Sequence, residues 1–295
     1  MRLKETLRYF VPLLGSSVVL IVLLRQIDGR KILWAAQHFN PWVLALVILL
    51  GPPFVLLKAF KWHLLLRVAI PEASYRLALR SFLLGMTASL ITPGRLGELA
   101  RAACFPGKRT PVLALTLMDK LIDVTVLLTL CAMSLWAYST RLGIIGITGG
   151  VVFAASIWVG PQWMKRWPPI HPFVTVMPSV SGRLVVLNGV LAICCYALLA
   201  LQFHLLLSGL HPVPLWVSST VLPPILLGSA LPLFINGLGG REGIATVLLK
   251  HYAVPGEQAV LASFLLFVVS GLLPGGVGIV SGLKVFRRGG GLKSC

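Results

Sequence analysis

The chain has 295 residues, of which 57% are hydrophobic and 12% charged, whereas an average soluble domain has roughly 45–50% apolar and about 25% charged residues. Lys and Arg number 26 against 8 Asp and Glu, which gives a formal net charge of +18. So few charged groups exclude a soluble globule of this size, and basic residues clustered between long apolar runs are typical of polytopic membrane proteins rather than of nucleic-acid-binding ones.

Apolar segments long enough to cross, or nearly cross, a bilayer occur six times along the chain. In order they are 9–24, 41–57, 112–136, 142–159, 184–207 and 259–286. Two further segments, 77–91 and 215–235, are interrupted by Gly and Pro and run directly into charged, glycine-rich sequence. Irregular backbone is tolerated at membrane depth only where protein or water satisfies its polar groups. The predicted fold is therefore an all-α polytopic membrane protein, a single integral membrane domain over 1–295, with about six full transmembrane helices and two broken or re-entrant segments.

Counts of Lys and Arg predict the orientation if both broken segments enter and return on the same side. Eighteen of the 26 basic residues then lie on one side, among them Lys58, Lys61 and Arg101, and five lie on the other. The remaining three lie in or beside apolar segments. By the positive-inside rule the richer side is cytoplasmic, which predicts an inner-membrane protein with both termini in the cytoplasm.

Cysteine and histidine patterns indicate neither a disulfide framework nor a metal centre. The five Cys form no CxxC pair, and the six His form no HExxH motif; these spacings are the usual signals of such sites. No GxxxxGK[ST] phosphate loop is present, so we expect neither a metal, nor a cofactor, nor ATP hydrolysis by this chain.

Charged residues in or beside the apolar segments are the main candidates for function. They are Arg95, Glu98, Asp119, Lys120, Asp123, Arg241 and Glu242. An unpaired charge costs about 2.5–3.5 kcal/mol at the centre of a membrane helix, so we expect these side chains to face one another or water. Asp119 and Asp123 share one helix face, so either a cation lies between them or one of them is protonated. Arg–Glu pairs that merely fasten the broken segments to the bundle are an alternative interpretation.

Glycine-rich sequence follows both broken segments and is suited to phosphate binding. A helix that begins after Pro93 and Gly94 would direct free N–H groups and the positive end of its dipole at a neighbouring anion, with Gly97 in its first turn. In the second motif Gly239 and Gly240 allow close backbone approach.

The two broken segments also resemble each other. Residues 84–98 and 227–243 each contain Leu-Gly, a short apolar run, a Pro or Gly break, a Gly-Arg pair and then Glu. This predicts an internal repeat, with half-repeats over about 41–136 and 184–286. Interrupted helices in corresponding positions of two repeats indicate a transporter whose site lies near the middle of the membrane.

Four sequence motifs carry a resemblance to a known family. KxxKW at 58–62, TPGRLGELAR at 92–101, MDKLIDV at 118–124 and PxxxNGLGGREG at 232–243 resemble the lysylphosphatidylglycerol synthase transmembrane-region family, also called flippase-like integral membrane proteins. The resemblance implies a polytopic protein that moves lipids or lipid-linked sugars between leaflets. It also implies that the family's polar positions are held by Arg95, Glu98, Asp119, Asp123, Arg241 and Glu242. Because the chain ends at Cys295, shortly after the last predicted span, we do not expect it to carry the aminoacyltransferase domain of the fused members.

The leading hypothesis is a lipid translocase, not an enzyme, that moves an anionic phospholipid or a polyprenyl-phosphate-linked lipid. The residues expected to bind the lipid phosphate are Arg95, Arg241, Gly94, Gly97, Gly239 and Gly240, and those expected to balance charge or couple transport are Glu98, Asp119, Lys120, Asp123 and Glu242. One alternative is an enzyme that modifies a lipid headgroup, with Asp119 and Asp123 as general base or metal ligands. Another is a non-transporting membrane partner of a glycosyl- or aminoacyltransferase. Expected partners are membrane lipids and, under the last alternative, such a transferase, but not nucleic acid.

Overall fold

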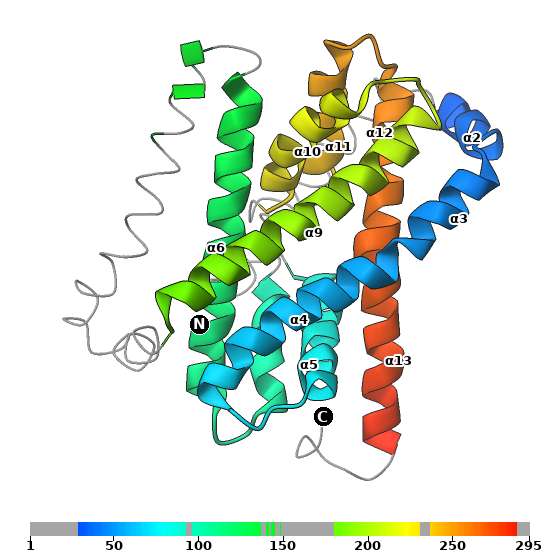
Figure 1. Cartoon of the computed structure of the whole chain (residues 1–295). Helices are drawn as coiled ribbons and strands as arrows, with labels where there is room; N and C mark the ends of the chain where they lie inside the picture. The colour runs from blue at the N-terminus through cyan, green and yellow to red at the C-terminus, as the bar shows by residue number, and fades with distance from the viewer. Residues whose placement is uncertain are drawn as a thin grey trace, which may run out of the picture. The chain divides into compact units, whose positions relative to one another are not determined.

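The computed structural model describes residues 29–92, 96–136, 140–141, 143–144, 148, 180–230 and 237–287. This part of the chain is helical and contains no strand (Figure 1), so the prediction of an all-α polytopic membrane protein is confirmed. The predicted span 9–24, and nearly all of 142–159, lie outside the described residues.

Three helical stretches are long and apolar enough to cross a membrane: Pro41–Ala69, Gly182–Ser208 and Gly256–Val280. The first joins α3 (Pro41–Leu49) to α4 (Gly51–Ala69) and begins where the Asn40 side chain accepts a hydrogen bond of 2.9 Å from the Trp42 N–H, a normal helix cap. The second is α9. The third consists of α12 (Gly256–Phe267), the π-helical turn η3 (Val268–Leu272) and α13 (Leu273–Arg287).

The remaining helices include the two predicted broken segments. They are α2 (Gly29–Gln37), α5 (Tyr75–Ser89), the 3₁₀ helix η1 (Leu96–Cys104), α6 (Arg109–Trp136), α10 (Leu215–Ala230) and α11 (Gly240–Lys250). The two broken segments form α5 and α10, of 15 and 16 residues. At 1.5 Å per residue these helices are only about 23 and 24 Å long, shorter than the hydrocarbon core of about 30 Å. The next described helices along the chain are η1 after α5 and α11 after α10.

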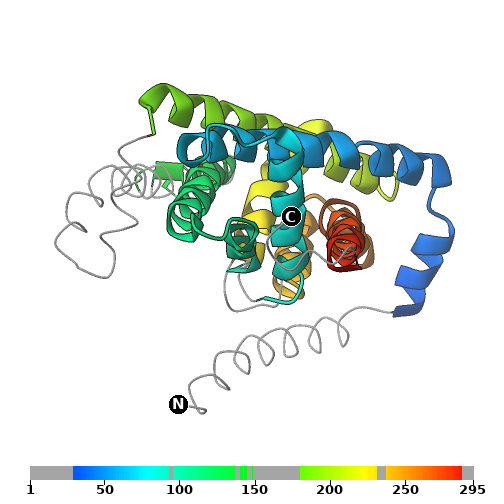
Figure 2. The same cartoon turned by 90° about the horizontal axis from the view of Figure 1, so that it is seen from below.

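The described helices fall into two compact units. Unit 1 comprises Met1–Pro52, Ser89–Gly97 and Ala197–Leu273, and unit 2 comprises Pro53–Ala88, Glu98–Tyr196 and Pro274–Cys295. In unit 1, α11 packs against α10 and α12. In unit 2, α4 and the first half of α9 lie side by side in both cartoon views (Figure 2), and the core gathers large side chains such as Trp62, Phe82 and Leu115.

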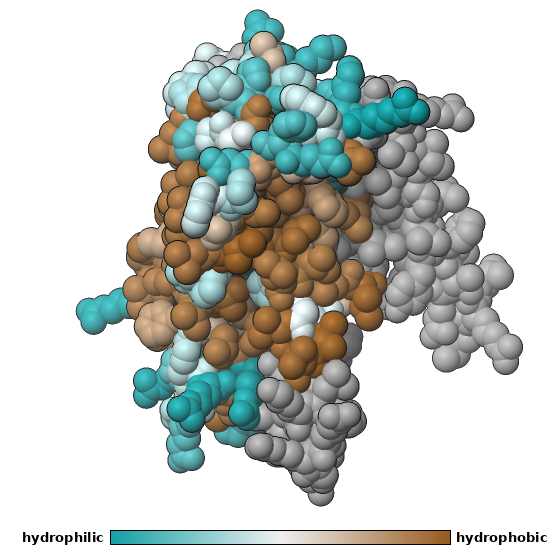
Figure 3. All heavy atoms as spheres, turned by 90° about the vertical axis from the view of Figure 1, so that its right-hand side faces the viewer, coloured by the Kyte–Doolittle hydropathy of each residue, from teal (hydrophilic) through white to brown (hydrophobic). Residues whose placement is uncertain are grey.

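Apolar side chains also cover much of the outer surface. Trp42, Val277 and Val280 are more than half exposed, and Figure 3 shows hydrophobic side chains gathered on the drawn face. An exposed apolar surface of this extent needs a non-aqueous neighbour, which for helices of this length and composition is the bilayer.

Candidate functional site

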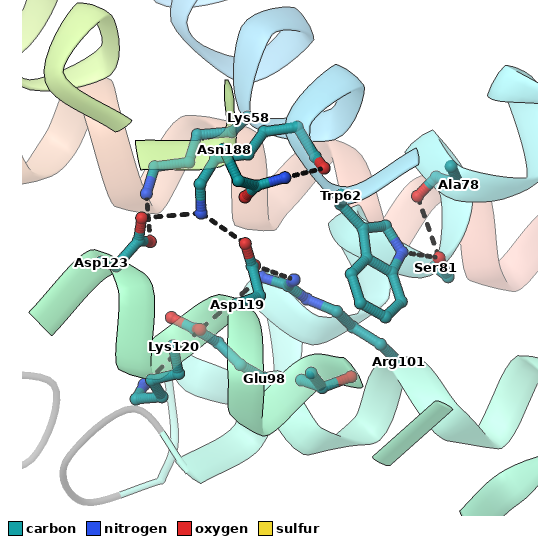
Figure 4. A network of polar contacts seen from close by, with 12 residues as sticks. Lys58, Trp62, Ala78, Ser81, Glu98, Arg101, Asp119, Lys120, Asp123 and Asn188 are labelled. Carbon is teal, nitrogen blue, oxygen red and sulfur yellow. Dashed lines mark hydrogen bonds and ion pairs between the residues drawn. The ribbon is translucent and has the colours of Figure 1, made fainter. Parts of the chain in front are cut away.

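Unit 2 contains a buried group of charged side chains, which we call the ion network (Figure 4). Its members come from three helices: Lys58 and Lys61 from α4, Glu98 and Arg101 from η1, and Asp119, Lys120 and Asp123 from α6. Isolated charges at such depth would be costly, and pairing of opposite charges offsets that cost.

The two lysines of α4 hold both aspartates of α6. Lys61 is fully buried and forms an ion pair with Asp119, and its Nζ lies 2.7 Å from Asp123 Oδ1. Lys58 Nζ donates to Asp123 Oδ2 at 2.5 Å. Because the aspartates share one helix face, their mutual repulsion requires a cation or a proton between them. The structure places a cation there, the ammonium group of Lys61.

Arg101 joins the network from η1. Its Nη1 donates to Asp119 Oδ2 at 2.9 Å, and its guanidinium lies 5.1 Å from the ring centre of Trp62 and 4.8 Å from that of Phe82. These distances are within the range of cation–π attraction. Gly85 of α5 makes this position possible, because a Cβ there would lie 2.7 Å from Arg101 Cγ. The guanidinium is thus held both by a carboxylate and by two aromatic faces.

Glu98 and Lys120 form the more exposed edge of the network. Glu98 Oε2 lies 3.6 Å from Arg101 Nη2 and 3.5 Å from Lys120 Nζ, and the Glu98 and Lys120 side chains are 20% and 26% exposed. With these residues the network has four cations and three carboxylates. Among the described residues, cations thus outnumber carboxylates in the network by one.

α9 supports the network from one side. Asn188 Nδ2 donates to the Lys61 backbone carbonyl at 3.2 Å, and Tyr196 Oη donates to the Asp123 carbonyl at 3.2 Å. Both bonds tie a network residue to a long helix rather than to a loop. Such support keeps the positions of the charged side chains well defined.

The network includes three basic residues that lie outside the predicted set of functional charges. Lys58, Lys61 and Arg101 were counted with the cytoplasmic basic residues, apart from the functional charges, but all three pair with carboxylates of α6 or η1. The predicted span 41–57 was ended at the first lysine, whereas the helix continues to Ala69. The available signal was the spacing of Lys58, Lys61 and Trp62, which lie on one side of a helix.

Unit 1 holds a second, separate charged pair at the start of α11. Arg241 Nε donates to Glu242 Oε1 at 2.9 Å, and the Gly239 N–H donates to Glu242 Oε2 at 2.8 Å. The Arg241 guanidinium lies 4.4 Å from the ring centre of Phe267 in α12. The predicted cluster of Gly239, Gly240, Arg241 and Glu242 is thus brought together, and both charged side chains are buried.

The other predicted phosphate-binding residues lie elsewhere. Arg95 and Gly94 are outside the described residues. The Gly97 N–H donates to Thr92 Oγ1 at 2.7 Å, so in this structure that donor is already used. Among the described residues no group of three or more His, Cys, Asp or Glu side chains is arranged to hold a metal ion. The network cations Lys58, Lys61 and Arg101, with Trp62 and Phe82 around Arg101, are the site residues absent from the predicted set.

A comparison with protein families gives one clear result. The model described as lysylphosphatidylglycerol synthase TM region matches residues 9–278. The match covers most of the chain, including every residue of the ion network and the Arg241–Glu242 pair. The comparison with curated proteins finds no match to this chain.

Proposed function

Since the chain belongs to the lysylphosphatidylglycerol synthase transmembrane-region family, whose membrane domains are associated with lipid modification or flipping, we propose that it is a lipid translocase. It moves a lipid with an anionic phosphate headgroup between the leaflets of the cytoplasmic membrane, with both chain termini in the cytoplasm. The headgroup passes along the charged side chains while its acyl chains stay in the bilayer.

The observation that carries this proposal is the ion network itself, in which the described side chains contribute four cations and three carboxylates. Arg101 and Lys61 are almost fully buried. Buried cations are stabilised by nearby anions. An anionic headgroup would add a further anion beside these cations, and the partly exposed Lys120 offers it the first contact.

The enzyme alternative receives less support from the same contacts. Asp119 is engaged by Lys61 and Arg101, and Asp123 by Lys58 and Lys61. A general base or a metal ligand needs a carboxylate that faces the reacting group. Mass spectrometry of lipids incubated with the pure protein separates the two functions, because a translocase leaves the lipid mass unchanged.

A charge-compensation experiment tests the proposal. Purified protein is reconstituted into vesicles that contain a fluorescent phosphatidylglycerol, and the rate of leaflet transfer is followed by quenching from outside. Lys120→Gln removes one of the four described cations, so we expect the rate to fall by about tenfold, as for a lost charge-assisted contact of about 1.4 kcal/mol. The double change Lys120→Gln with Glu98→Gln also removes one carboxylate, returns the described network to one more cation than carboxylates, and should recover most of the rate.

The matched control is Arg109→Gln, which removes one charge from an exposed position at the start of the same helix. Its rate should stay within about twofold of wild type, since exposed charges contribute little. The proposed role of the network charge would be contradicted if folded Lys120→Gln transferred lipid at the wild-type rate. It would also be contradicted if the double variant transferred lipid more slowly than Lys120→Gln alone. A third outcome would favour the alternative of a non-transporting membrane partner. In that case the network charges could be removed without effect, and a complex of this chain with a transferase could be isolated.

A further inference from the structure

Two of the membrane-length helical stretches are interrupted along their course. In Pro41–Ala69 the break is a turn at Leu50 followed by Gly51, Pro52 and Pro53. In Gly256–Val280 it is the π-helical turn η3 followed by Pro274. Proline has no N–H to donate, so it interrupts the hydrogen bonds that keep a helix straight. Single π-helical turns are rare and occur frequently at functional positions. Each stretch therefore has a point at which it bends more easily than a regular helix.

The two breaks lie next to each other. A Cβ on Gly51 would be 3.6 Å from Val269 Cγ1 and 3.8 Å from the Val269 carbonyl oxygen. The break in the first stretch thus contacts the π-helical turn of the other. Adjacent breaks can act together as one joint, because bending at one of them is not resisted by a straight helix at the other.

Each break also separates a segment of unit 1 from a segment of unit 2. Unit 1 ends at Pro52 in the first stretch and at Leu273 in the other. Before the second break, α12 packs against α11 of unit 1. After it, α13 is bonded to α5 of unit 2, where Thr87 Oγ1 donates to the Gly275 carbonyl at 2.8 Å. Bending at the breaks therefore leaves the contacts inside each unit intact.

α9 passes from unit 2 to unit 1 after Tyr196 without a break. An intact helix curves only gently, so α9 restricts any rotation of the units to a small angle. It is bonded to the first stretch on both sides of the break. Gln202 Nε2 donates to the Val47 carbonyl at 3.1 Å in unit 1, and Asn188 Nδ2 donates to the Lys61 carbonyl at 3.2 Å in unit 2. These bonds keep both halves of the first stretch attached to α9 while the stretch bends.

We propose that the paired breaks, at Gly51–Pro53 and Val268–Pro274, form a hinge about which the two units rotate by a small angle during lipid transfer. Hinges of such motions are a few residues at the ends of helices, and transporters expose their sites alternately by rocking one group of helices against another. The inference rests on the proposed function for the purpose of the rotation. The rotation itself can be measured without any transport.

Distance measurements between two spin labels test the hinge in the full chain, in nanodiscs of phosphatidylcholine and phosphatidylglycerol. One label is placed on Cys194 of unit 2, which is exposed, and the other on Val247→Cys of unit 1, at a position 62% exposed. Cys295→Ser prevents labelling at the C-terminus. The control pair lies inside unit 1: Trp42→Cys with Val247→Cys, in a chain that also carries Cys194→Ser and Cys295→Ser. The distribution of distances between the units should be broader than that within unit 1.

Pro52→Ala with Pro53→Ala restores the two missing N–H donors, so that α3 and α4 can join into one regular helix. We expect the distribution between the units to narrow and leaflet transfer to slow by about tenfold or more, because the restored hydrogen bonds resist bending. The matched control is Pro223→Ala with Pro224→Ala, a second adjacent pair of prolines, which lies in α10 and wholly within unit 1. It should change neither the distribution between the units nor the rate of transfer.

Three results would overturn the inference. They are an unchanged distribution between the units in the chain with Pro52→Ala and Pro53→Ala, an equal narrowing within unit 1, and a narrowed distribution with transfer at the wild-type rate. If this double variant does not fold, Pro274→Ala decides the matter, because it restores the missing donor of the second break and should narrow the same distribution. Failure of the proposed function has a different signature: wild type would show no leaflet transfer, while the distance distributions would still report the hinge.

Discussion

Substitution of Asp119 should be the most damaging single change in the ion network. Its carboxylate, with the side chain 6% exposed, lies between Lys61, which is fully buried, and Arg101, which is 3% exposed. Asp119→Asn preserves the shape but leaves both buried cations without their closest counter-ion. Loss of one partner from a buried ion pair typically costs about 3–5 kcal/mol, and we expect a loss of unfolding free energy in that range.

Lys61→Met should be milder although Lys61 is more deeply buried. Without the lysine, Arg101 still binds Asp119 at 2.9 Å and Lys58 still binds Asp123 at 2.5 Å, so no buried charge loses its last partner. Replacement of a buried ion by an apolar side chain of similar size is often nearly neutral. We expect Lys61→Met to lose less than about 2 kcal/mol of unfolding free energy. The double variant that combines Asp119→Asn with Lys61→Met should be at least about 1 kcal/mol more stable than Asp119→Asn alone.

Unfolding by titration with sodium dodecyl sulfate in mixed micelles measures these differences, with thiol labelling as the signal. Cys104, Cys131 and Cys195 are buried and react only when the helices separate. Arg109→Gln, at an exposed position, serves as the control. Two results would refute the reasoning that Asp119 compensates buried cations. One is an unfolding free energy of Asp119→Asn within about 1 kcal/mol of wild type. The other is a double variant, Asp119→Asn with Lys61→Met, that is less stable than Asp119→Asn alone.

Three glycine substitutions provide further tests by the same unfolding assay. Gly85→Ala should destabilise unit 2 by about 1–3 kcal/mol, because its Cβ would lie 2.7 Å from Arg101 Cγ. The control is Gly189→Ala in α9, where a Cβ meets nothing within 4 Å, and it should be neutral or slightly stabilising. Equal effects of the two substitutions on stability would contradict this prediction. Gly237→Ala should cost more than about 2 kcal/mol, because Gly237 has a φ of +77° and a Cβ there would lie 2.5 Å from Ser229 Cβ; wild-type stability of this variant would show that the turn before α11 is not tightly packed.

Local sequence features predicted most of the helices but misplaced one helix end that matters. Apolar runs located α6, α9 and the chain from α12 to α13, because membrane depth requires long apolar helices whatever their partners. The first charge after an apolar run was interpreted as the end of the span at Leu57. α4 instead continues to Ala69, since the charges of Lys58 and Lys61 are neutralised inside the protein and need no water.

The two glycine-rich motifs had different outcomes. The second could be predicted as a unit because all its partners are within a few residues: Gly239, Arg241 and Glu242 interact within one turn of α11. The first contributes Arg101, whose partner Asp119 lies on α6. There the i, i+4 spacing of Asp119 and Asp123 required a cation or a proton, but it did not identify Lys61, which lies 58 residues from Asp119. The stacking of Arg101 on Trp62 and Phe82 depends likewise on the packing of α4 and α5 around η1.

The sequence by itself therefore determined that this is a helical membrane protein and which carboxylates matter, because hydropathy and the scarcity of acids are properties of local composition. Only the tertiary structure decided which cations those carboxylates bind. Helices far apart in sequence must pack before Lys58, Lys61 and Arg101 can meet Asp119 and Asp123. That packing sets which charges compensate one another in the ion network, since the balance of a buried cluster depends on which side chains share it and not on how many the chain contains.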